Sequence, residues 1–278
     1  MNTLEDKITM ITGAASKRGM GHAIAVRLAK EGADAVVLDK YAAPKSIWPG
    51  DENWKGLEAV VAEIETLGRK ALAIVADVSD TAAVNDAVSQ AIAKFGKIDI
   101  LVHCGGIRGS MTTPIIELSD EEWQAILDVN LTGSFYISRA VAKTMVPDGE
   151  GKKIVLIGSK AATQGYAGSA GYCASKHGLL GLGRTLAAEL AQYKINVNII
   201  NPGAFDTNLR DEQIIRKAES QGISLAEAMA NEQKSGPATH IPLGRLGTPE
   251  DIADLVFFLV SEQSQYITGE AILIGGGI

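Results

Sequence analysis

The sequence predicts a single-domain α/β protein in which helices cover both faces of a doubly wound, mostly parallel sheet. Short apolar segments rich in β-branched residues alternate with segments of helical spacing along the chain. This is the pattern of buried parallel strands joined by right-handed crossover helices. The chain has 278 residues, 46% of them hydrophobic, and no repeat, low-complexity run or linker divides it. Such a chain can bury one complete core.

The first strand–turn–helix unit lies near the N-terminus. Residues 7–12 form an apolar strand, a glycine-containing turn follows at 13–21, and residues 22–30 have helical spacing. Glycines there let the backbone approach a pyrophosphate at the positive end of the helix. The next strand, 35–39, ends in Asp39, whose carboxylate can accept hydrogen bonds from ribose hydroxyls. The unit therefore predicts a Rossmann-type dinucleotide site.

The rest of the chain continues this alternation. Ser119 with Glu122 has the spacing of a capping box, and Thr248 before Pro249 has the pattern of a helix cap with proline in the first turn. Ligands of such sheets bind beyond the carboxyl ends of the strands. We predict strands at 71–76, 98–102, 153–158, 195–200 and 271–274, and helices at 57–67, 81–95, 120–146, 172–192 and 249–261.

Tyr172 and Lys176 are the strongest candidates for chemistry. They lie four residues apart on a predicted helix and therefore share one face. A free phenol titrates near ~10, and a neighbouring ammonium lowers its pKa toward the range of a useful acid/base group. Ser159 lies upstream at the end of a strand, where its hydroxyl could bind substrate or merely cap that strand. The nearby dinucleotide site favours the catalytic interpretation.

Taken in order, these motifs resemble those of the short-chain dehydrogenase/reductase family over nearly the whole chain. The family's Thr-Gly-x-x-x-Gly-x-Gly turn is similar to residues 12–21, with two extra residues before the second glycine. The resemblance implies four catalytic residues, namely Asn130, Ser159, Tyr172 and Lys176. The implied cofactor-binding residues are Gly13, Ser16, Arg18, Gly19, Met20, Gly21, Asp39, Asp77, Val78, Gly105, Tyr172, Lys176, Pro202, Gly203, Phe205 and Thr207.

A nicotinamide cofactor would supply the hydride, and the protein would manage one proton. Tyr172 would exchange that proton with the substrate, and Ser159 would hydrogen-bond the substrate oxygen. Lys176 would bind the nicotinamide ribose and hold down the pKa of the phenol. By resemblance Asn130 would position a water in a proton relay to Lys176, although it could also be an ordinary polar residue of its helix. We expect hydride transfer to or from a small to medium secondary alcohol or ketone.

Three departures from the family pattern affect these expectations. His103 and Cys104 stand where the family usually has two asparagines, so side-chain roles there are open. Gly275 replaces a common aspartate near the C-terminus. Residues 40–55 form a longer connection than usual, and some nicotinoprotein-like members such as carveol-type dehydrogenases are similar in this respect. With two tryptophans, this loop could cover the adenosine end of the cofactor or meet a neighbouring subunit.

The identity of the dinucleotide depends on charges near the adenosine ribose. Asp39 would repel a 2′-phosphate, which favours NAD. Arg18 and Lys40 could instead grip that phosphate, so NADP stays possible. Two alternatives follow: an NADP-linked carbonyl reductase of the ketoacyl type, and a non-catalytic dinucleotide-binding sensor. Intact Ser159, Tyr172 and Lys176 argue against the sensor.

Composition limits the partners. The net charge of −7 and the lack of a dense basic stripe argue against nucleic acid. No apolar run approaches ~18 residues, so we expect no membrane segment. Two cysteines without a disulfide framework suit the cytoplasm. The four histidines lack ligand spacing, and we expect no catalytic metal.

Two segments are assigned to substrate access and assembly. Residues 207–240 carry two polar helical patterns, 209–220 and 224–234, and we expect a lid over the site, with a simple surface excursion as the alternative. Gly178, Gly181 and Gly183 weaken the helix that carries Tyr172. The corresponding helix of the family lies in a subunit interface, so we expect a homotetramer, although packing within the chain would also explain small residues.

Overall fold

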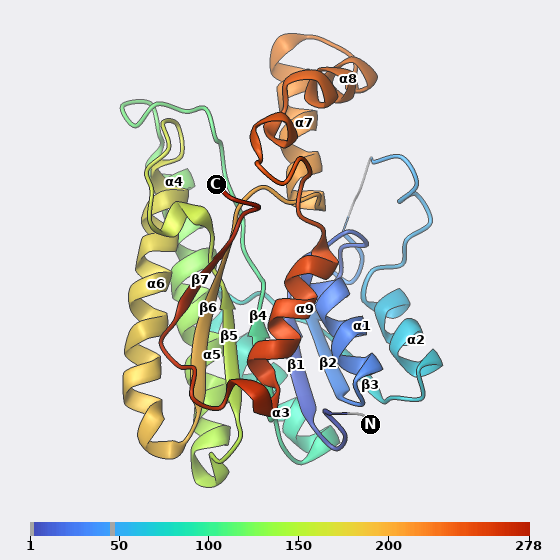
Figure 1. The fold of residues 1–278 in the computed structure, drawn as a ribbon, viewed down its shortest axis with the longest axis vertical. Coiled ribbons are helices and arrows are strands. Elements are labelled where there is room, and N and C mark those ends of the chain that lie inside the picture. Colours follow the sequence, from blue (N-terminus) through green and yellow to red (C-terminus); the bar gives the residue numbers. More distant parts are fainter. Residues whose placement is uncertain (1–2, 45–47) are drawn as a thin grey trace.

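A seven-stranded parallel sheet forms the centre of the computed structural model, which describes residues 3–44 and 48–278 (Figure 1). The strand order is β3-β2-β1-β4-β5-β6-β7, and each neighbouring pair is parallel. The order reverses direction between β1 and β4, which confirms the predicted doubly wound topology. The strands are β1 (Ile8–Thr12), β2 (Asp34–Asp39), β3 (Ala71–Val75), β4 (Ile100–His103), β5 (Lys153–Ile157), β6 (Asn196–Pro202) and β7 (Ala271–Ile274).

Helices cover both faces of the sheet. The helices α1, α2 and α9 pack on one face, and α3, α5 and α6 pack on the other. The helices α7 and α8 lie apart from both layers, at the top of Figure 1. Their bounds are α1 (Met20–Lys30), α2 (Leu57–Thr66), α3 (Thr81–Phe95), α4 (Asp120–Leu127), α5 (Gly133–Met145), α6 (Ala170–Leu190), α7 (Asn208–Gln221), α8 (Leu225–Ser235) and α9 (Pro249–Val260).

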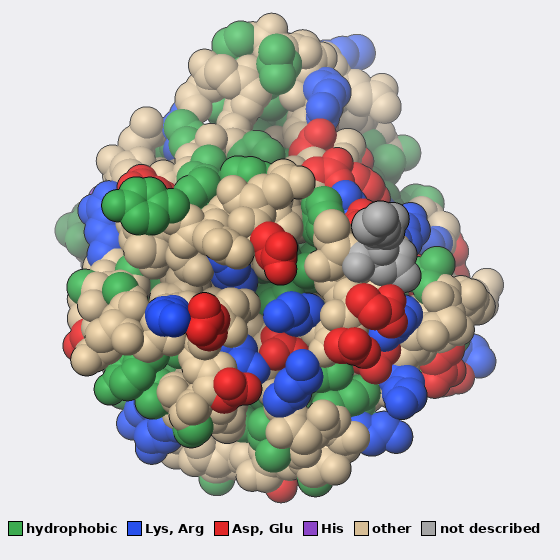
Figure 2. All heavy atoms as spheres, turned by 60° about the horizontal axis from the view of Figure 1, so that its bottom comes forward, with side chains coloured by type: hydrophobic (Ala, Val, Ile, Leu, Met, Phe, Trp, Pro, Cys, Tyr) green, Lys and Arg blue, Asp and Glu red, His purple; other side chains and the backbone are tan. Residues whose placement is uncertain are grey.

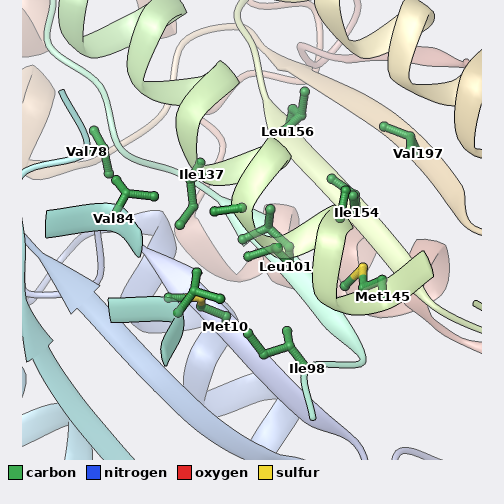
Figure 3. Packing of buried hydrophobic residues seen from close by; sticks show 14 of the residues in the cluster. Met10, Val78, Val84, Ile98, Leu101, Ile137, Met145, Ile154, Leu156 and Val197 are labelled. Carbon is green, nitrogen blue, oxygen red and sulfur yellow. The ribbon is translucent and has the colours of Figure 1, made fainter. Parts of the chain in front are cut away.

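The core consists of two apolar layers, one on each face of the sheet. Successive strand residues point to opposite faces, so Met10 enters one layer and Ile11 the other, and both are fully buried. Figure 3 shows the first layer, where Met10 and Leu101 from the strands approach Ile137 of α5. Because both faces are covered, the strands β1, β4 and β5 are buried at every position rather than at every second one.

Helix ends follow local chemistry in most places. Thr248 and Asp251 form a complete capping box at the start of α9, as the Thr248–Pro249 pattern predicted. The capping box predicted at α4 forms only in part. Ser119 accepts the Glu122 N–H (3.1 Å), but the Glu122 carboxylate accepts the N–H of Ser110 instead of reaching back to Ser119. A tertiary contact therefore replaces the local one.

The predicted continuous helix over 120–146 is wrong in one detail. A π-helical turn, Asp128–Thr132, separates α4 from α5. Apolar spacing cannot reveal this wider turn, because the helical axis continues on both sides of it. Asn130 lies within the turn and is fully buried. Such single turns occur frequently at functional sites.

Candidate active site

The helix α6 brings Tyr172 and Lys176 together one turn apart. The residues are 7% and 5% exposed respectively, and the Lys176 Nζ lies 5.8 Å from the centroid of the Tyr172 ring. The ring packs with Ala161 and Cys173 in a small buried cluster. The phenol therefore faces the protein interior beside an ammonium group, as the four-residue spacing predicted.

The pKa of Tyr172 is lower than that of a free phenol. Burial is the largest single influence and raises this pKa, whereas the positive charges of Lys176 and Arg108 lower it. Hydrogen bonds from the Ser159 hydroxyl and from Arg108 also favour the phenolate. The site therefore supplies a buried phenol that loses its proton more readily than a free tyrosine does.

Ser159 has two roles at the end of β5. Its Oγ accepts the Ala161 N–H (3.1 Å), which caps a short 3₁₀ turn at Lys160–Ala162. The same hydroxyl also favours the phenolate form of Tyr172. The capping role is therefore present, and the substrate-binding role, which the sequence left as the alternative, stays a prediction.

The ammonium group of Lys176 anchors this side chain at the carboxyl end of β5. The Nζ donates a hydrogen bond to the Ile157 carbonyl (3.0 Å). Burial lowers the pKa of Lys176. The charges of Tyr172 and Cys104 raise this pKa, the charge of Arg108 lowers it, and the net effect is a decrease. A Cβ added to Gly106 would come 3.7 Å from this Nζ, so the glycine leaves space beside the ammonium.

Asn130 connects the loop after β4 to the helix α6. Its Oδ1 accepts the Ile107 N–H (2.8 Å), and its Nδ2 donates to the Ile107 carbonyl (2.8 Å) and to Ser175 Oγ (3.0 Å). The amide is thus fully engaged within the protein. Its side chain fixes the loop that borders Lys176.

The glycine turn forms a tight backbone cradle before α1. Gly13 has a φ of +69°, and a Cβ there would come 2.9 Å from the Gly105 nitrogen. A Cβ on Gly21 would come 2.4 Å from the Gly13 oxygen. Gly19 donates its N–H to the Ser16 carbonyl (2.9 Å) and precedes Met20, the first residue of α1. The two additional residues are absorbed in this turn, and the cradle fits the pyrophosphate of a dinucleotide.

Asp39 lies at the end of β2 beside this cradle. Its Oδ2 accepts the Ala15 N–H (3.0 Å), and burial raises its pKa although backbone hydrogen bonds partly oppose this. The neighbouring Lys40 forms an ion pair with Asp77 (2.8 Å). Val78 follows Asp77 and is buried against Gly133. The residues predicted to contact the adenosine half therefore lie together at the ends of β2 and β3.

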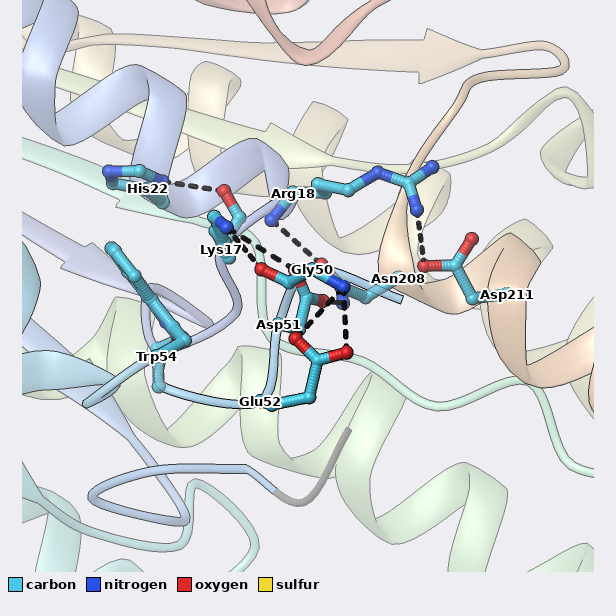
Figure 4. Close-up of polar contacts among 10 residues, drawn as sticks. Lys17, Arg18, His22, Gly50, Asp51, Glu52, Trp54, Asn208 and Asp211 are labelled. Atoms are coloured by element: carbon cyan, nitrogen blue, oxygen red, sulfur yellow. Dashed lines mark hydrogen bonds and ion pairs between the residues drawn. The ribbon is translucent and has the colours of Figure 1, made fainter. Parts of the chain in front are cut away.

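Arg18 is bound by two carboxylates that follow β6. Its guanidinium forms ion pairs with Asp206 and with Asp211 (2.8 Å). The backbone N–H of Arg18 donates to Asn208 Oδ1 (2.8 Å). Figure 4 shows the glycine turn joined in this way to the start of α7. Sequence separations near 190 residues made these contacts invisible to motif analysis.

The long loop after β2 packs on the glycine turn and on α7 and α8. Trp54 Nε1 donates to the Ala15 carbonyl (2.7 Å), and Lys17 Nζ donates to the Gly50 carbonyl (2.6 Å) (Figure 4). Trp48 packs with the apolar cluster between α7 and α8. Residues 45–47 lie outside the described part of the chain. In the single chain the loop covers the side of the dinucleotide cradle.

The segment after β6 meets β7 and leads into α7. The Gly203 N–H donates to the Ile274 carbonyl (2.9 Å), and a Cβ on Gly203 would come 3.0 Å from the Gly275 Cα. This close approach accounts for glycine at position 203, and a Cβ on Gly275 would come 3.1 Å from the Ile278 oxygen. Pro202 ends β6, and the buried ring of Phe205 packs on Gly247 rather than standing free at the sheet edge. Thr207 is buried at the N-cap of α7.

The unusual His103 and Cys104 hold β4 to β1. Thr12 Oγ1 accepts the N–H groups of Cys104 and Gly105 (3.2 Å each), so its hydrogen is left to donate to His103 Nδ1 (2.7 Å). Burial, aided by Lys176, lowers the pKa of His103 to about 3, which keeps the ring neutral. Burial raises the pKa of Cys104 to about 12, although Lys176 opposes this. The thiol is therefore unreactive.

Packing within the chain explains two of the three glycines in α6. A Cβ on Gly178 would come 2.7 Å from Leu131, and one on Gly183 would come 2.7 Å from Ile199. A Cβ on Gly181 would meet nothing within 4 Å. Of these three glycines, Gly181 alone has no neighbour among the described residues that would exclude a larger side chain.

Sequence reasoning gave Arg108 no role at the site. Its guanidinium carbon lies 5.9 Å from the centroid of the Tyr172 ring. Arg108 lies in the loop after β4, outside every motif singled out in the sequence. The sequence did carry one signal for such a role, namely a basic residue shortly after a strand whose end lies at the site.

Surface and ligand features are unremarkable elsewhere in the described chain. On the face drawn in Figure 2, basic and acidic side chains are interspersed. Within residues 3–44 and 48–278, no three His, Cys, Asp or Glu side chains are grouped as metal ligands. No helix among these residues has both the length and the apolar character needed to cross a bilayer.

Known proteins resemble the chain over almost its full length. A family model described as enoyl-(acyl carrier protein) reductase matches residues 13–278. Short-chain reductase protein NovJ from Streptomyces niveus is 37% identical over 273 residues, 98% of this chain and 94% of NovJ. The 3-oxoacyl-[acyl-carrier-protein] reductase FabG from Thermotoga maritima is 34% identical over 275 residues, 99% of this chain and 98% of FabG.

Solved structures share the fold. Levodione reductase superposes with a TM-score of 0.85 at 31% identity, covering 98% of this chain and 97% of that one. NAD⁺-bound xylitol dehydrogenase superposes with a TM-score of 0.84 at 30% identity, covering 99% of each chain. The likeness therefore extends beyond the dinucleotide cradle to the whole sheet and its helices.

Proposed function

Because this chain belongs to the short-chain dehydrogenase/reductase family and is an NAD(P)-dependent oxidoreductase, we propose that it uses NAD to interconvert a secondary alcohol and its ketone, with Tyr172 as the acid/base group. The observation that carries the proposal is the buried Tyr172 phenol, whose pKa is lowered beside Lys176, Ser159 and Arg108. An inert helix face would not need a buried phenol among cationic groups.

The four residues divide the protein's share of the reaction. A bound nicotinamide dinucleotide would supply the hydride chemistry. Tyr172 takes the alcohol proton in oxidation and returns it in reduction. Ser159 donates a hydrogen bond to the substrate oxygen and stabilises the charge that develops there. Lys176 keeps the phenol acidic and offers its ammonium to the nicotinamide ribose, while Asn130 holds the bordering loop and serves the proton relay.

Charges beside the adenosine ribose support NAD over NADP. Asp39 presents a carboxylate at the end of β2, where a 2′-phosphate would be repelled. The two basic groups that would compensate are already engaged, since Lys40 is paired with Asp77 and Arg18 with Asp206 and Asp211. An NADP-linked reductase of the ketoacyl type would need at least one of them to be released.

The remaining proposals concern the lid, assembly and location. We propose that residues 207–240 form a lid, because Arg216 of α7 donates to the Gly109 carbonyl (3.2 Å) in the loop that carries Arg108. The exposed Phe135 and the open space at Gly181 support a homotetramer. Two free thiols, Cys104 and Cys173, support a cytoplasmic setting.

The test is the substitution Tyr172→Phe, which removes one hydroxyl and retains the buried ring. We expect kcat to fall by about 10²- to 10⁴-fold, while the affinity for NAD, measured by titration, changes little. Tyr193→Phe, at a half-exposed surface tyrosine, is the matched control. Turnover would be followed by the absorbance of reduced nicotinamide over a panel of secondary alcohols.

Three results would contradict parts of the proposal. A Phe variant with near wild-type kcat would remove Tyr172 from the mechanism. A clear preference for NADP would overturn the cofactor choice. No turnover across a broad panel, with dinucleotide binding intact, would favour a sensor.

A further inference from the structure

Arg108 lies at the reaction centre but belongs to none of the predicted catalytic or cofactor motifs. Its guanidinium carbon is 5.9 Å from the centroid of the Tyr172 ring, and its positive charge favours the phenolate form of that residue. Asn130 holds the neighbouring Ile107 through both backbone atoms. The position of this arginine is therefore fixed by the same contacts that shape the site.

The guanidinium has unused binding capacity. Its Nε–H is buried and has no hydrogen-bond partner among residues 3–44 and 48–278. Within the same residues no carboxylate forms an ion pair with Arg108, whereas Arg18 pairs with two carboxylates and Arg210 with one. The carboxylate of Glu122 reaches this loop, but it accepts the N–H of Ser110. A buried unsatisfied donor on a charged group is costly, and a bound acceptor would remove that cost.

Two positively charged side chains lie near the phenol of Tyr172. Lys176 lies 5.8 Å from the ring centroid and Arg108 lies 5.9 Å from it. Burial lowers the pKa of Lys176, and the charge of Arg108 contributes in the same direction. Two cations near one phenol favour a bound anion beside them, since charges interact strongly where water is excluded.

Resting on the proposed function, we propose that Arg108 binds a carboxylate of the substrate, so that the enzyme acts on 2- or 3-hydroxy acids and the corresponding keto acids. The planar guanidinium can hold a carboxylate through its Nε–H and one Nη–H together. Because the Arg108 guanidinium carbon lies 5.9 Å from the centroid of the Tyr172 ring, a carboxylate bound to it must be close to the carbon that carries the reacting oxygen. The carboxylate is unchanged by the reaction.

The experiment compares each hydroxy acid with its own methyl ester. Values of kcat/KM with NAD would be measured for 2- and 3-hydroxybutanoate and for the two esters, using the wild type, Arg108→Gln, Arg108→Lys and the surface control Arg139→Gln. Arg108 also affects the pKa of Tyr172, but that effect applies to acid and ester alike. The ratio of acid to ester therefore isolates the contact with the carboxylate.

We expect the acid-to-ester ratio to fall on the order of 10- to 100-fold in Arg108→Gln, mainly through KM. Arg108→Lys should recover part of it, because lysine retains the charge but not the two-pronged geometry. Arg139→Gln should leave the ratio unchanged. In the pH profile, the limb assigned to Tyr172 should move to higher pH in Arg108→Gln with either substrate.

Equal losses for acid and ester in Arg108→Gln would overturn the proposal. Should the wild type turn over neither acid nor ester while binding NAD, the proposed function fails, and calorimetric titration with the two hydroxy acids decides on Arg108. Binding that is lost in Arg108→Gln would retain the carboxylate site. Undetectable binding to the wild type, or equal binding to both proteins, would refute it.

Discussion

Asp211 is a buried carboxylate in the first turn of α7, and its titration gives the sharpest prediction about the lid. The residue is 3% exposed. Its Oδ2 accepts a hydrogen bond from Arg18 (2.8 Å), but its Oδ1 has no partner in the described chain. Burial raises the pKa of Asp211 to about 6, with Arg18 lowering it and Asp206 and Asp51 raising it.

The sign of the pH dependence follows from this increase. The folded protein binds this proton more tightly than the unfolded chain, whose aspartate titrates near 3.8. The contribution of the carboxyl to stability is therefore fully present below pH 3.8 and is lost as the pH rises through about 6. The difference between the two pKa values corresponds to at most about 3 kcal/mol.

Asp211→Asn keeps the shape of the side chain and removes the titration. We expect the free energy of unfolding of the variant, relative to wild type, to increase between about pH 4.5 and about pH 7.5 by about 2 kcal/mol. Urea unfolding at several pH values and one protein concentration would measure it. Asp254→Asn, at a side chain that is 70% exposed, is the control and should show no such rise. A difference between Asp211→Asn and wild type that stays constant over this range would refute the reasoning.

Two further predictions concern the cofactor site. Gly21→Ala would place a Cβ 2.4 Å from the Gly13 oxygen, so we expect loss of about 1–3 kcal/mol of stability and of NAD binding by titration. Gly181→Ala, in open space, should be stable to within about 1 kcal/mol; comparable damage in both would rule out the steric argument. Asp39→Asn removes the carboxylate beside the ribose, and the kcat/KM ratio of NADP to NAD should rise at least about 10-fold. An unchanged ratio would show that Asp39 does not choose the cofactor.

Local pattern was sufficient for the architecture. The helix α3 begins after Asp80, which caps two N–H groups, and ends at Gly96 in the left-handed conformation, and its predicted bounds 81–95 are those observed. The predicted strands differ from the observed ones by one or two residues at their ends. Strand and helix periodicities are properties of neighbouring residues, so the sequence carries them directly.

The candidate site was only partly accessible in this way. The spacing of Tyr172 and Lys176 is a local fact of one helix, and the glycine turn is a local fact of one strand–helix junction. The wider turn at Asn130 was missed, because it depends on hydrogen bonds to Ile107 across the site.

The sequence by itself determined the alternation of strands and helices, the glycine cradle and the pairing of a phenol with an ammonium group on one helix face. Only the tertiary structure decided that Arg18 binds the start of α7, that the loop after β2 packs on the glycine turn, and that Arg108 approaches Tyr172. The physical reason is the sequence separation between the residues that interact. Backbone periodicity is set by residues a few positions apart, whereas the charge and packing around the phenol come from segments that meet only when the sheet has formed.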